Sequence, residues 1–153
     1  MEENSMKRTI VFLLLAGLLL NTLPVMGNAV EKNIIYCEDG CYITVEIITN
    51  GARESGSVTG KKRYTYYSES GSKEWVVDLN GSFTYNGSSA TCTSSSVDVT
   101  IHDSSWYVVS KYATKSSNKA SASVTMGDKP AGQLVSTVPV SLTLSCDANG
   151  NLS

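Results

Sequence analysis

The sequence has few of the residues that nucleic-acid binding or zinc chemistry requires. Only one histidine occurs among 153 residues, which excludes most zinc sites because their ligand sets combine histidine with cysteine or carboxylate. Lysine and arginine number 12 against 14 aspartate and glutamate, a net charge of −2. A protein that binds a phosphate backbone needs a strongly basic surface, and we therefore expect no nucleic-acid partner.

The chain also lacks an apolar run long enough for a membrane-spanning helix. The run Ile10–Leu20 is about half of the roughly 20 residues that a bilayer requires. A basic pair precedes it and small residues follow up to Ala29, which is the pattern of a signal peptide. We predict a signal peptide over residues 1–29 and a single secreted domain over residues 30–153, extracellular and without a membrane anchor after cleavage.

Helical periodicity is absent as well, and two-residue alternation dominates. From Trp75 to Tyr85 the apolar side chains occupy every second position, as in a strand with one buried face. The alternating set comprises Trp75, Val77, Leu79, Gly81, Phe83 and Tyr85. A turn at Asn80-Gly81 would put Trp75 and Phe83 on opposite faces, so Gly81 is interpreted as a bulge or a close backbone approach.

The next turn predicts how this strand pairs. Asn86-Gly87 is a typical centre for a two-residue hairpin. A turn there would place Phe83 opposite Ala90 and would direct the side chain of Cys92 into the core.

Several other segments carry strand signals and are separated by turn residues. They are Tyr42–Thr49, Val58–Tyr67, Val97–Ile101, Trp106–Thr114 and Lys119–Met126. About seven strands joined largely by short turns predict an all-β fold, an antiparallel two-sheet sandwich of immunoglobulin-like kind, with a small β-barrel as the alternative.

The four cysteines all lie in the segment expected to be exported, where disulfides persist. Four cysteines allow three connectivities. The alternation that begins at Leu134 places Cys146 on an inward face, like Cys92, so a Cys92–Cys146 bridge is preferred. This pairing leaves Cys37 and Cys41 to close a small local loop, and no second chelating pair supports a metal site.

Three short segments resemble a group of small secreted proteins of Gram-positive bacteria. The segments are Phe83–Cys92, Asp103–Trp106 and Leu142–Asp147, and the resemblance covers residues 58–153. It implies export and a β-rich domain and implies no activity. Because Cys37 and Cys41 are unusual in that pattern, the resemblance also favours the pairing of Cys92 with Cys146.

The segment Lys61–Tyr67 interleaves cations with aromatic rings and supplies the candidate ligand-binding residues. These are Lys61, Lys62, Arg63 and Tyr67. Ring faces and cations together can contact an anionic polymer or a sugar. In the alternative interpretation, Tyr64 and Tyr66 join the core while the basic residues protect an exposed sheet edge from aggregation.

No pattern identifies a catalytic centre, and we expect neither an enzyme nor a metal or other cofactor. His102 stands beside Asp103, Ser104 and Ser105, but neighbours in a tight loop cannot adopt the relay geometry of a catalytic triad. That segment therefore predicts a turn. A carboxylate pair of the glycosidase kind would have to come from Glu46, Glu54, Glu69, Glu74 and Asp78.

These observations favour a secreted, non-catalytic binding or interaction module. The sequence does not identify its extracellular ligand, for which a carbohydrate, such as a cell-wall glycan, and a protein are the candidates. Two other classes remain open. Small size, export and disulfides also suit a secreted toxin, antimicrobial or immunity factor, whereas the strand carboxylates would suit a hydrolase.

Overall fold

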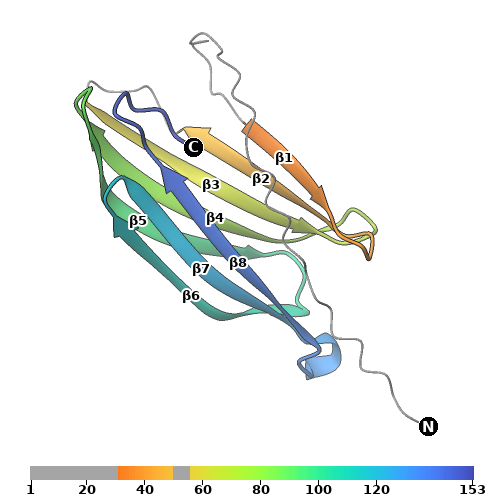
Figure 1. Cartoon of the computed structure of the whole chain (residues 1–153). Coiled ribbons are helices and arrows are strands. Elements are labelled where there is room, and N and C mark those ends of the chain that lie inside the picture. Colours follow the sequence, from red (N-terminus) through yellow and green to blue (C-terminus); the bar gives the residue numbers. More distant parts are fainter. Residues whose placement is uncertain (1–30, 50–55) are drawn as a thin grey trace.

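The computed structural model describes residues 31–49 and 56–153. The predicted signal peptide, residues 1–29, lies outside this part of the chain. The described part contains eight strands and one 3-10 turn (Figure 1). They are β1 (Glu31–Tyr36), β2 (Tyr42–Thr49), β3 (Ser57–Tyr67), β4 (Lys73–Tyr85), β5 (Ala90–Ile101), β6 (Trp106–Ser116), β7 (Lys119–Asp128), η1 (Pro130–Gly132) and β8 (Ser136–Ser145).

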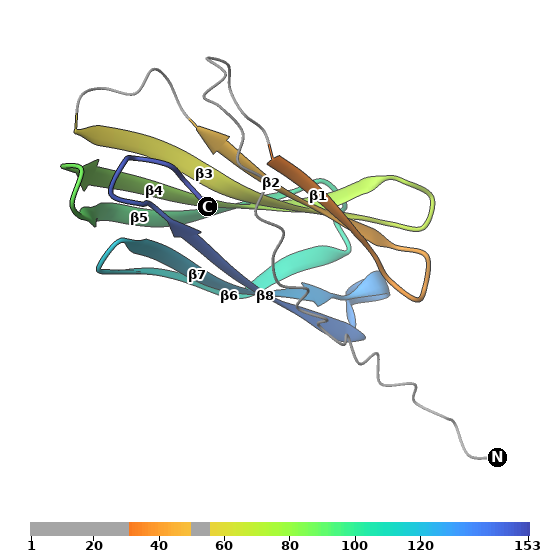
Figure 2. The same ribbon diagram turned by 45° about the horizontal axis from the view of Figure 1, so that its top comes forward.

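The strands form two antiparallel sheets that lie face to face as two layers (Figure 2). One sheet has the order β1-β2-β3-β4-β5 and the other the order β6-β7-β8. The predicted two-sheet sandwich is confirmed, and the alternative of a closed barrel is not. Consecutive strands are neighbours throughout each sheet, a meander in place of the Greek-key connections of immunoglobulin domains.

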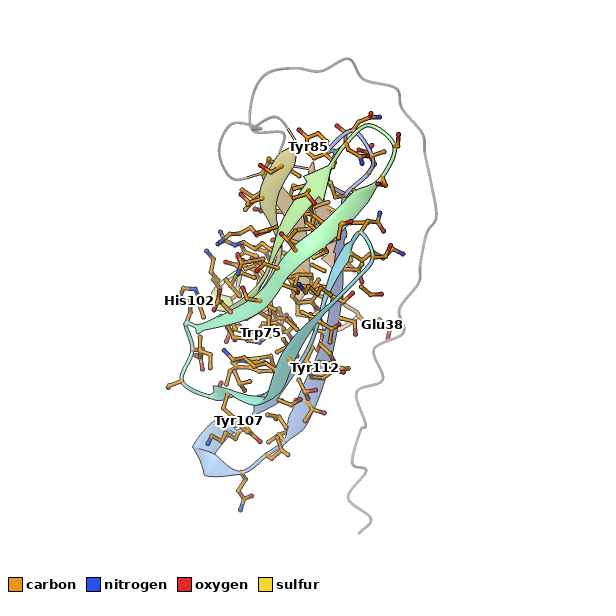
Figure 3. All side chains as sticks on the ribbon, turned by 90° about the vertical axis from the view of Figure 1, so that its left-hand side faces the viewer. Glu38, Trp75, Tyr85, His102, Tyr107 and Tyr112 are labelled. Atoms are coloured by element: carbon orange, nitrogen blue, oxygen red, sulfur yellow. A yellow bond between two sulfur atoms is a disulfide. The ribbon has the colours of Figure 1, made fainter. Side chains whose placement is uncertain are left out.

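The inward face of β4 is the centre of the core, as its alternation predicts. Trp75, Val77 and Leu79 are fully buried. The Trp75 ring is stacked parallel to Tyr66, with centroids 5.0 Å apart, and it meets Trp106 of the opposite sheet at 5.7 Å. Figure 3 shows Trp75 between the two layers. This aromatic cluster joins the sheets at the end of the sandwich where β4 begins.

The β4–β5 hairpin differs from the predicted pairing. Tyr85 pairs with Ala90, and Phe83 therefore lies opposite Cys92 and not opposite Ala90. The reason is the turn, which is a four-residue loop in which the Asn86 side-chain oxygen accepts hydrogen bonds from the backbone N–H groups of Ser88 and Ser89 (3.0 and 2.9 Å). A bulge at Thr93 of β5 then shifts the register of the pairs that lie farther from the turn.

Gly81 lies under the ring of Phe83. A Cβ atom at Gly81 would stand 2.7 Å from Cε2 of Phe83 and 3.2 Å from Cβ of Ala120 in the opposite sheet. The predicted close approach is therefore confirmed, whereas the extra residue of the nearby bulge is Thr93, which belongs to β5 and not to β4.

The cysteines form one of the two predicted disulfides. Cys37 and Cys41 are bonded to each other and close the β1–β2 hairpin. Cys92 and Cys146 both point inward as predicted and are 5% and 0% exposed, but no disulfide bond joins them. The Cys92 N–H donates to the Ser117 carbonyl (2.7 Å) and the Cys146 N–H donates to the Asn118 carbonyl (3.0 Å).

The predicted Cys92–Cys146 bridge is therefore corrected. Ser117 and Asn118 form the turn between β6 and β7, and this turn lies between the backbones of the two cysteines. Alternation predicts which way a side chain points, but it does not predict that a third segment will separate two inward-facing residues.

Strand β1 was not expected, because its apolar residues are consecutive and do not alternate. Ile34, Ile35 and Tyr36 are 50%, 51% and 76% exposed. The strand pairs only with β2 and forms one edge of the five-stranded sheet.

Candidate ligand-binding surface

The predicted ligand-binding residues lie in the middle of the five-stranded sheet. Strand β3 pairs with β2 on one side and β4 on the other, so the basic residues cannot protect an exposed edge, and that part of the alternative interpretation is wrong. Its other part is confirmed, since Tyr64 and Tyr66 are buried in the core. Side chains alternate between the two faces of a strand, and on β3 the even-numbered residues face the core. The odd-numbered Lys61, Arg63 and Tyr67 therefore share the outer face of the sheet. Lys62 is even-numbered and lies on the core side.

Tyr67 belongs to a line of three aromatic rings across that outer face. The strand register aligns Tyr36 of β1 with Tyr42 of β2, and Tyr42 with Tyr67 of β3. The rings of Tyr42 and Tyr67 are stacked with centroids 4.4 Å apart, and Tyr36 lies 6.1 Å from Tyr42 at an angle of 44°. We call Tyr36, Tyr42 and Tyr67 the tyrosine row. Its outermost member, Tyr36, is 76% exposed.

A second line of residues crosses the same face and carries charges of both signs. The register aligns Lys32, Glu46, Arg63, Asp78 and Asp98 across the five strands, and we call this the charged row. Arg63 donates two hydrogen bonds of 2.8 Å to the Asp78 carboxylate. Lys61 lies 3.1 Å from the same carboxylate, and Lys32 lies 3.4 Å from Glu46.

These ion pairs determine the charge state of Asp78. Partial burial opposes its ionisation, but the hydrogen bonds from Arg63 and Lys61 outweigh that effect and lower the pKa of Asp78. Lys61, Arg63 and Lys32 balance Asp78, Asp98 and Glu46. The charged row with Lys61 therefore has no net charge at neutral pH.

Two threonines fill the space between the tyrosine row and the charged row. Thr44 and Thr65 are adjacent in the register and only 2% and 3% exposed, although they lie on the outer face. The hydroxyl of Thr44 has no hydrogen-bond partner. Side chains from the neighbouring rows thus cover these positions, which makes the outer face continuous.

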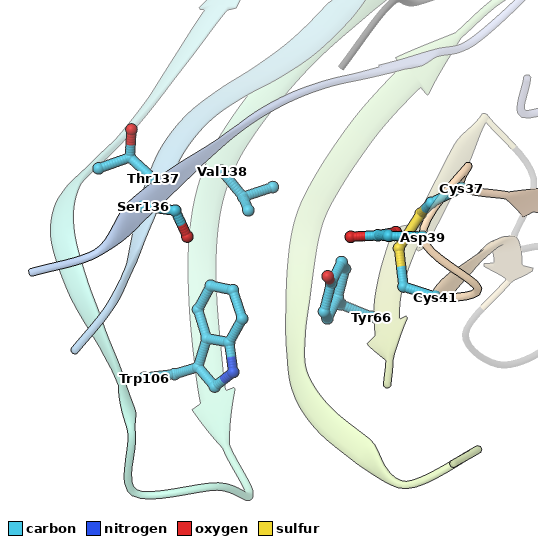
Figure 4. A pocket seen from close by; sticks show the side chains of 8 residues that line it. All are labelled: Cys37, Asp39, Cys41, Tyr66, Trp106, Ser136, Thr137 and Val138. Atoms are coloured by element: carbon cyan, nitrogen blue, oxygen red, sulfur yellow. A yellow bond between two sulfur atoms is a disulfide. The ribbon is translucent and has the colours of Figure 1, made fainter. Parts of the chain in front are cut away.

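Among the hollows formed by the described residues, two lie away from this face. One, the end cleft, has a volume of about 40 Å³ and opens between the sheets at the end of the sandwich. Figure 4 shows Trp106 and Ser136 on one side of it, and Tyr66, Asp39 and the disulfide on the other.

The other hollow, the edge groove, has a volume of about 370 Å³ and lies between β5 and β6. Hydroxyl groups of Thr93, Ser94, Ser95 and Thr114 line it together with Lys115. The Lys115 ammonium group already donates a hydrogen bond to the Thr93 carbonyl at 2.6 Å.

The disulfide loop brings together one set of possible metal-ligand atoms. One atom from each of Cys37, Asp39 and Cys41 lies within 4.8 Å of the others. Both sulfur atoms are bonded to each other, so neither is available as the thiolate that coordinates a metal.

Several of the carboxylates considered for catalysis have structural partners. The Asp103 carboxylate accepts a hydrogen bond from the backbone N–H of Ser105 (2.8 Å), and hydrogen bonds from Ser105 lower the pKa of Asp103. The predicted turn is therefore confirmed, and Figure 3 shows His102 on the connection that follows β5. Glu74 accepts a hydrogen bond from the Trp106 indole at 3.2 Å. Glu54 lies outside the described residues.

Sequence analysis missed Tyr36 and Tyr42. The signal that could have found them is the symmetric segment Tyr36-Cys37-Glu38-Asp39-Gly40-Cys41-Tyr42. A disulfide across such a short loop aligns the residues on either side of it, and Gly40 adopts the positive φ of 84° that the turn requires.

Comparison with known proteins identifies no family. No family model and no curated protein matches the chain. The chain is similar to the crystal structure of hypothetical protein lmo2686 from Listeria monocytogenes EGD-e, at 19% sequence identity and a TM-score of 0.47, over 85% of this chain and 96% of that one. Over residues 31–49 and 56–153, no helix is both long and apolar enough to cross a membrane.

Proposed function

We propose that this chain is a secreted, non-catalytic binding module of a Gram-positive bacterium. Its ligand is an uncharged glycan of the extracellular surroundings, and the outer face of the five-stranded sheet binds it. One observation carries this proposal: the tyrosine row lies on the same face as the charged row, whose charges balance when Lys61 is included.

The tyrosine row offers the contact that a sugar requires chiefly at its exposed end, Tyr36, because the stacked rings of Tyr42 and Tyr67 each cover one face of the other. An aromatic ring is a large apolar surface with a polar tip, and a pyranose likewise has an apolar C–H face with hydroxyls at its rim. Tyr36, Tyr42 and Tyr67 come from adjacent strands, which stand about 4.8 Å apart. The row therefore extends across three strands and suits an extended polymer. A small molecule would instead bind in a deep pocket.

The charged row favours a neutral ligand over an anionic one. Both oxygens of Asp78 already accept hydrogen bonds from Arg63 and Lys61. A polyanion would have to compete with these ion pairs, and separating them leaves a partly buried carboxylate unpaired. A neutral glycan leaves the pairs intact and can use their remaining hydrogen-bonding capacity.

Binding to a panel of glycans and to insoluble cell-wall material tests the proposal directly. Tyr36→Ala and Tyr42→Ala should each weaken retention about three- to tenfold, since an aromatic stacking contact contributes about 0.5–1.5 kcal/mol. Tyr112→Ala is the matched control, because Tyr112 is 60% exposed but lies on β6 in the other sheet. Equal losses for all three variants would contradict the assignment of the face.

Ionic strength separates a neutral ligand from an anionic one. Retention of a neutral glycan should hardly change between about 0.1 and about 0.5 M salt, whereas binding to a polyanion falls steeply over that interval. A strong salt dependence would contradict a neutral ligand. Hydrolytic turnover of a bound glycan by the purified protein would contradict a non-catalytic module.

Export has its own test. Protein recovered from the culture medium should begin at Val30, which N-terminal sequencing would establish. Recovery of the chain only inside the cells, with residues 1–29 still attached, would contradict secretion.

A further inference from the structure

The end cleft combines features that neither the outer face nor the edge groove has. It lies between the disulfide loop of β1–β2 and the first residues of β6 and β8 (Figure 4). We propose that it is a second binding site, which takes an aliphatic primary ammonium group. This site is distinct from the tyrosine row and goes beyond the proposed glycan binding.

The walls of the cleft suit a cation. The rings of Tyr66 and Trp106 have centroids 5.4 Å apart and are tilted by 60°, so they form two aromatic walls at an angle. The carboxyl group of Asp39 closes the cleft on the loop side. Aromatic faces attract an ammonium ion through their quadrupole, and a carboxylate adds a charge-assisted hydrogen bond.

The aromatic walls are held in place before any ligand arrives. Tyr66 and Trp106 are 8% and 9% exposed, and both pack against the buried Trp75. The indole N–H of Trp106 donates to Glu74 (3.2 Å), which fixes the plane of the ring. On the other side, the Cys37–Cys41 disulfide restrains the loop that carries Asp39. A preformed site loses less conformational entropy on binding.

The size of the cleft selects the chemical group. A cavity that holds one water needs about 10–15 Å³, so about 40 Å³ accommodates an ammonium group with the first one or two methylene groups of its chain. The rest of a longer chain extends out of the open side of the cleft. A hexose has roughly a dozen heavy atoms and is several times too large.

A serine completes the polar side of the cleft. Ser136 of β8 lines the cleft opposite Asp39. Its hydroxyl can accept a second hydrogen bond from a primary ammonium group, which has three donors.

The electrostatic surroundings also favour a cation. The hairpin loops and strand ends that meet at this end of the sandwich carry more acidic than basic residues. The acidic ones are Glu38, Asp39, Glu69, Glu74, Asp103 and Asp128, and the basic ones are Lys73 and Lys129. Lys129 lies over the ring of Tyr107, 4.5 Å from its centroid. The excess of negative charge raises the local concentration of small cations.

Titration with n-butylammonium chloride, followed by ¹H–¹⁵N NMR of the oxidised protein, tests the site. The indole N–H signal of Trp106 should shift with saturation at millimolar concentrations, while 1-butanol, which has the same chain without the charge, should produce no saturable shift. Saturable binding of 1-butanol with similar affinity would overturn the proposal, and so would the absence of any saturable shift with n-butylammonium.

Two single-charge variants identify the carboxylate. Asp39→Asn should weaken n-butylammonium binding by at least about fivefold, because it removes a charge-assisted hydrogen bond. Glu38→Gln removes the same charge from the same loop, but Glu38 does not line the cleft, so its effect should stay below about twofold. Equal effects of the two variants would mean that only the general field of the acidic end attracts the cation and would overturn the site.

The two proposed sites can fail independently. Tyr36→Ala should leave n-butylammonium binding unchanged, and Asp39→Asn should leave retention on glycans unchanged. Loss of ammonium binding in Tyr36→Ala would refute two separate sites, whereas failure of all glycan binding would leave the NMR result intact.

Discussion

Asp78 offers the sharpest test of how the outer face is held together. Its carboxylate accepts two hydrogen bonds from Arg63 (both 2.8 Å) and one from Lys61 (3.1 Å), and its side chain is 15% exposed. Asp78→Asn keeps the shape of the side chain but leaves the positive charges of Arg63 and Lys61 facing a neutral amide.

The size of the effect follows from the degree of burial. Exposed ion pairs contribute about 0.2–1 kcal/mol, and breaking a buried pair costs about 3–5 kcal/mol. This pair lies between these limits because Arg63 and Lys61 keep 36% and 24% of their side-chain surface exposed. We expect Asp78→Asn to lower the free energy of unfolding by about 2 kcal/mol, which corresponds to a fall in Tm of about 8 °C for a domain of this size.

The pH dependence gives an independent check. The folded-state pKa of Asp78 is lowered from its ordinary value of 3.8, so its contribution to stability is complete well above pH 3.8 and is lost as the pH falls through the folded-state pKa. Urea unfolding of both proteins should show a constant difference from pH 7 to about pH 5 and a shrinking one below pH 3.8.

Asp98→Asn is the matched control. Asp98 lies next to Asp78 in the charged row, but it is exposed and accepts its hydrogen bond from neutral Asn80 (2.9 Å). Its substitution should change stability by less than about 0.5 kcal/mol. Equal losses for the two variants, or a difference for Asp78→Asn that does not shrink as the pH falls below 3.8, would refute the reasoning.

Other positions give further tests. Thr44→Val should raise the free energy of unfolding by about 1 kcal/mol in urea titrations, since the buried Thr44 hydroxyl has no partner; a loss of stability would mean that the hydroxyl is satisfied. Gly81→Val should lower Tm by several degrees because its Cβ would stand 2.7 Å from the Phe83 ring, and an unchanged Tm would contradict that contact. Ellman titration without reductant should detect no reactive thiol in the folded protein and two after denaturation, because Cys92 and Cys146 are buried; zero after denaturation would establish a bond between them.

The alternation of side chains along each strand was the main signal from which the fold could be predicted. The alternation from Trp75 to Tyr85 identified β4 and its buried face because a strand places successive side chains on opposite faces. Together with the hairpin turn at Asn86-Gly87, it also predicted that Cys92 points inward. It did not predict the partner of Phe83, because the register depends on the length of the turn, and the Asn86 side chain stabilises a four-residue loop there.

The candidate surface was predictable only in part. The segment Lys61–Tyr67 identified the correct strand, β3. The alternation of side chains then places Lys61, Arg63 and Tyr67 on the outer face and Lys62 on the core side. The sequence does not show that Asp78 pairs with Arg63, because they lie on neighbouring strands and meet only in the β3–β4 register.

The amino-acid sequence by itself determined the class of fold, the buried face of β4 and the direction in which Cys92 and Cys146 point. These properties follow from local alternation, which each strand carries within its own residues. Tertiary structure decided which residues became neighbours. The tyrosine row and the end cleft join residues from separate strands, and the β6–β7 turn keeps the two inward cysteines apart, because strand register and sheet packing depend on contacts between distant segments.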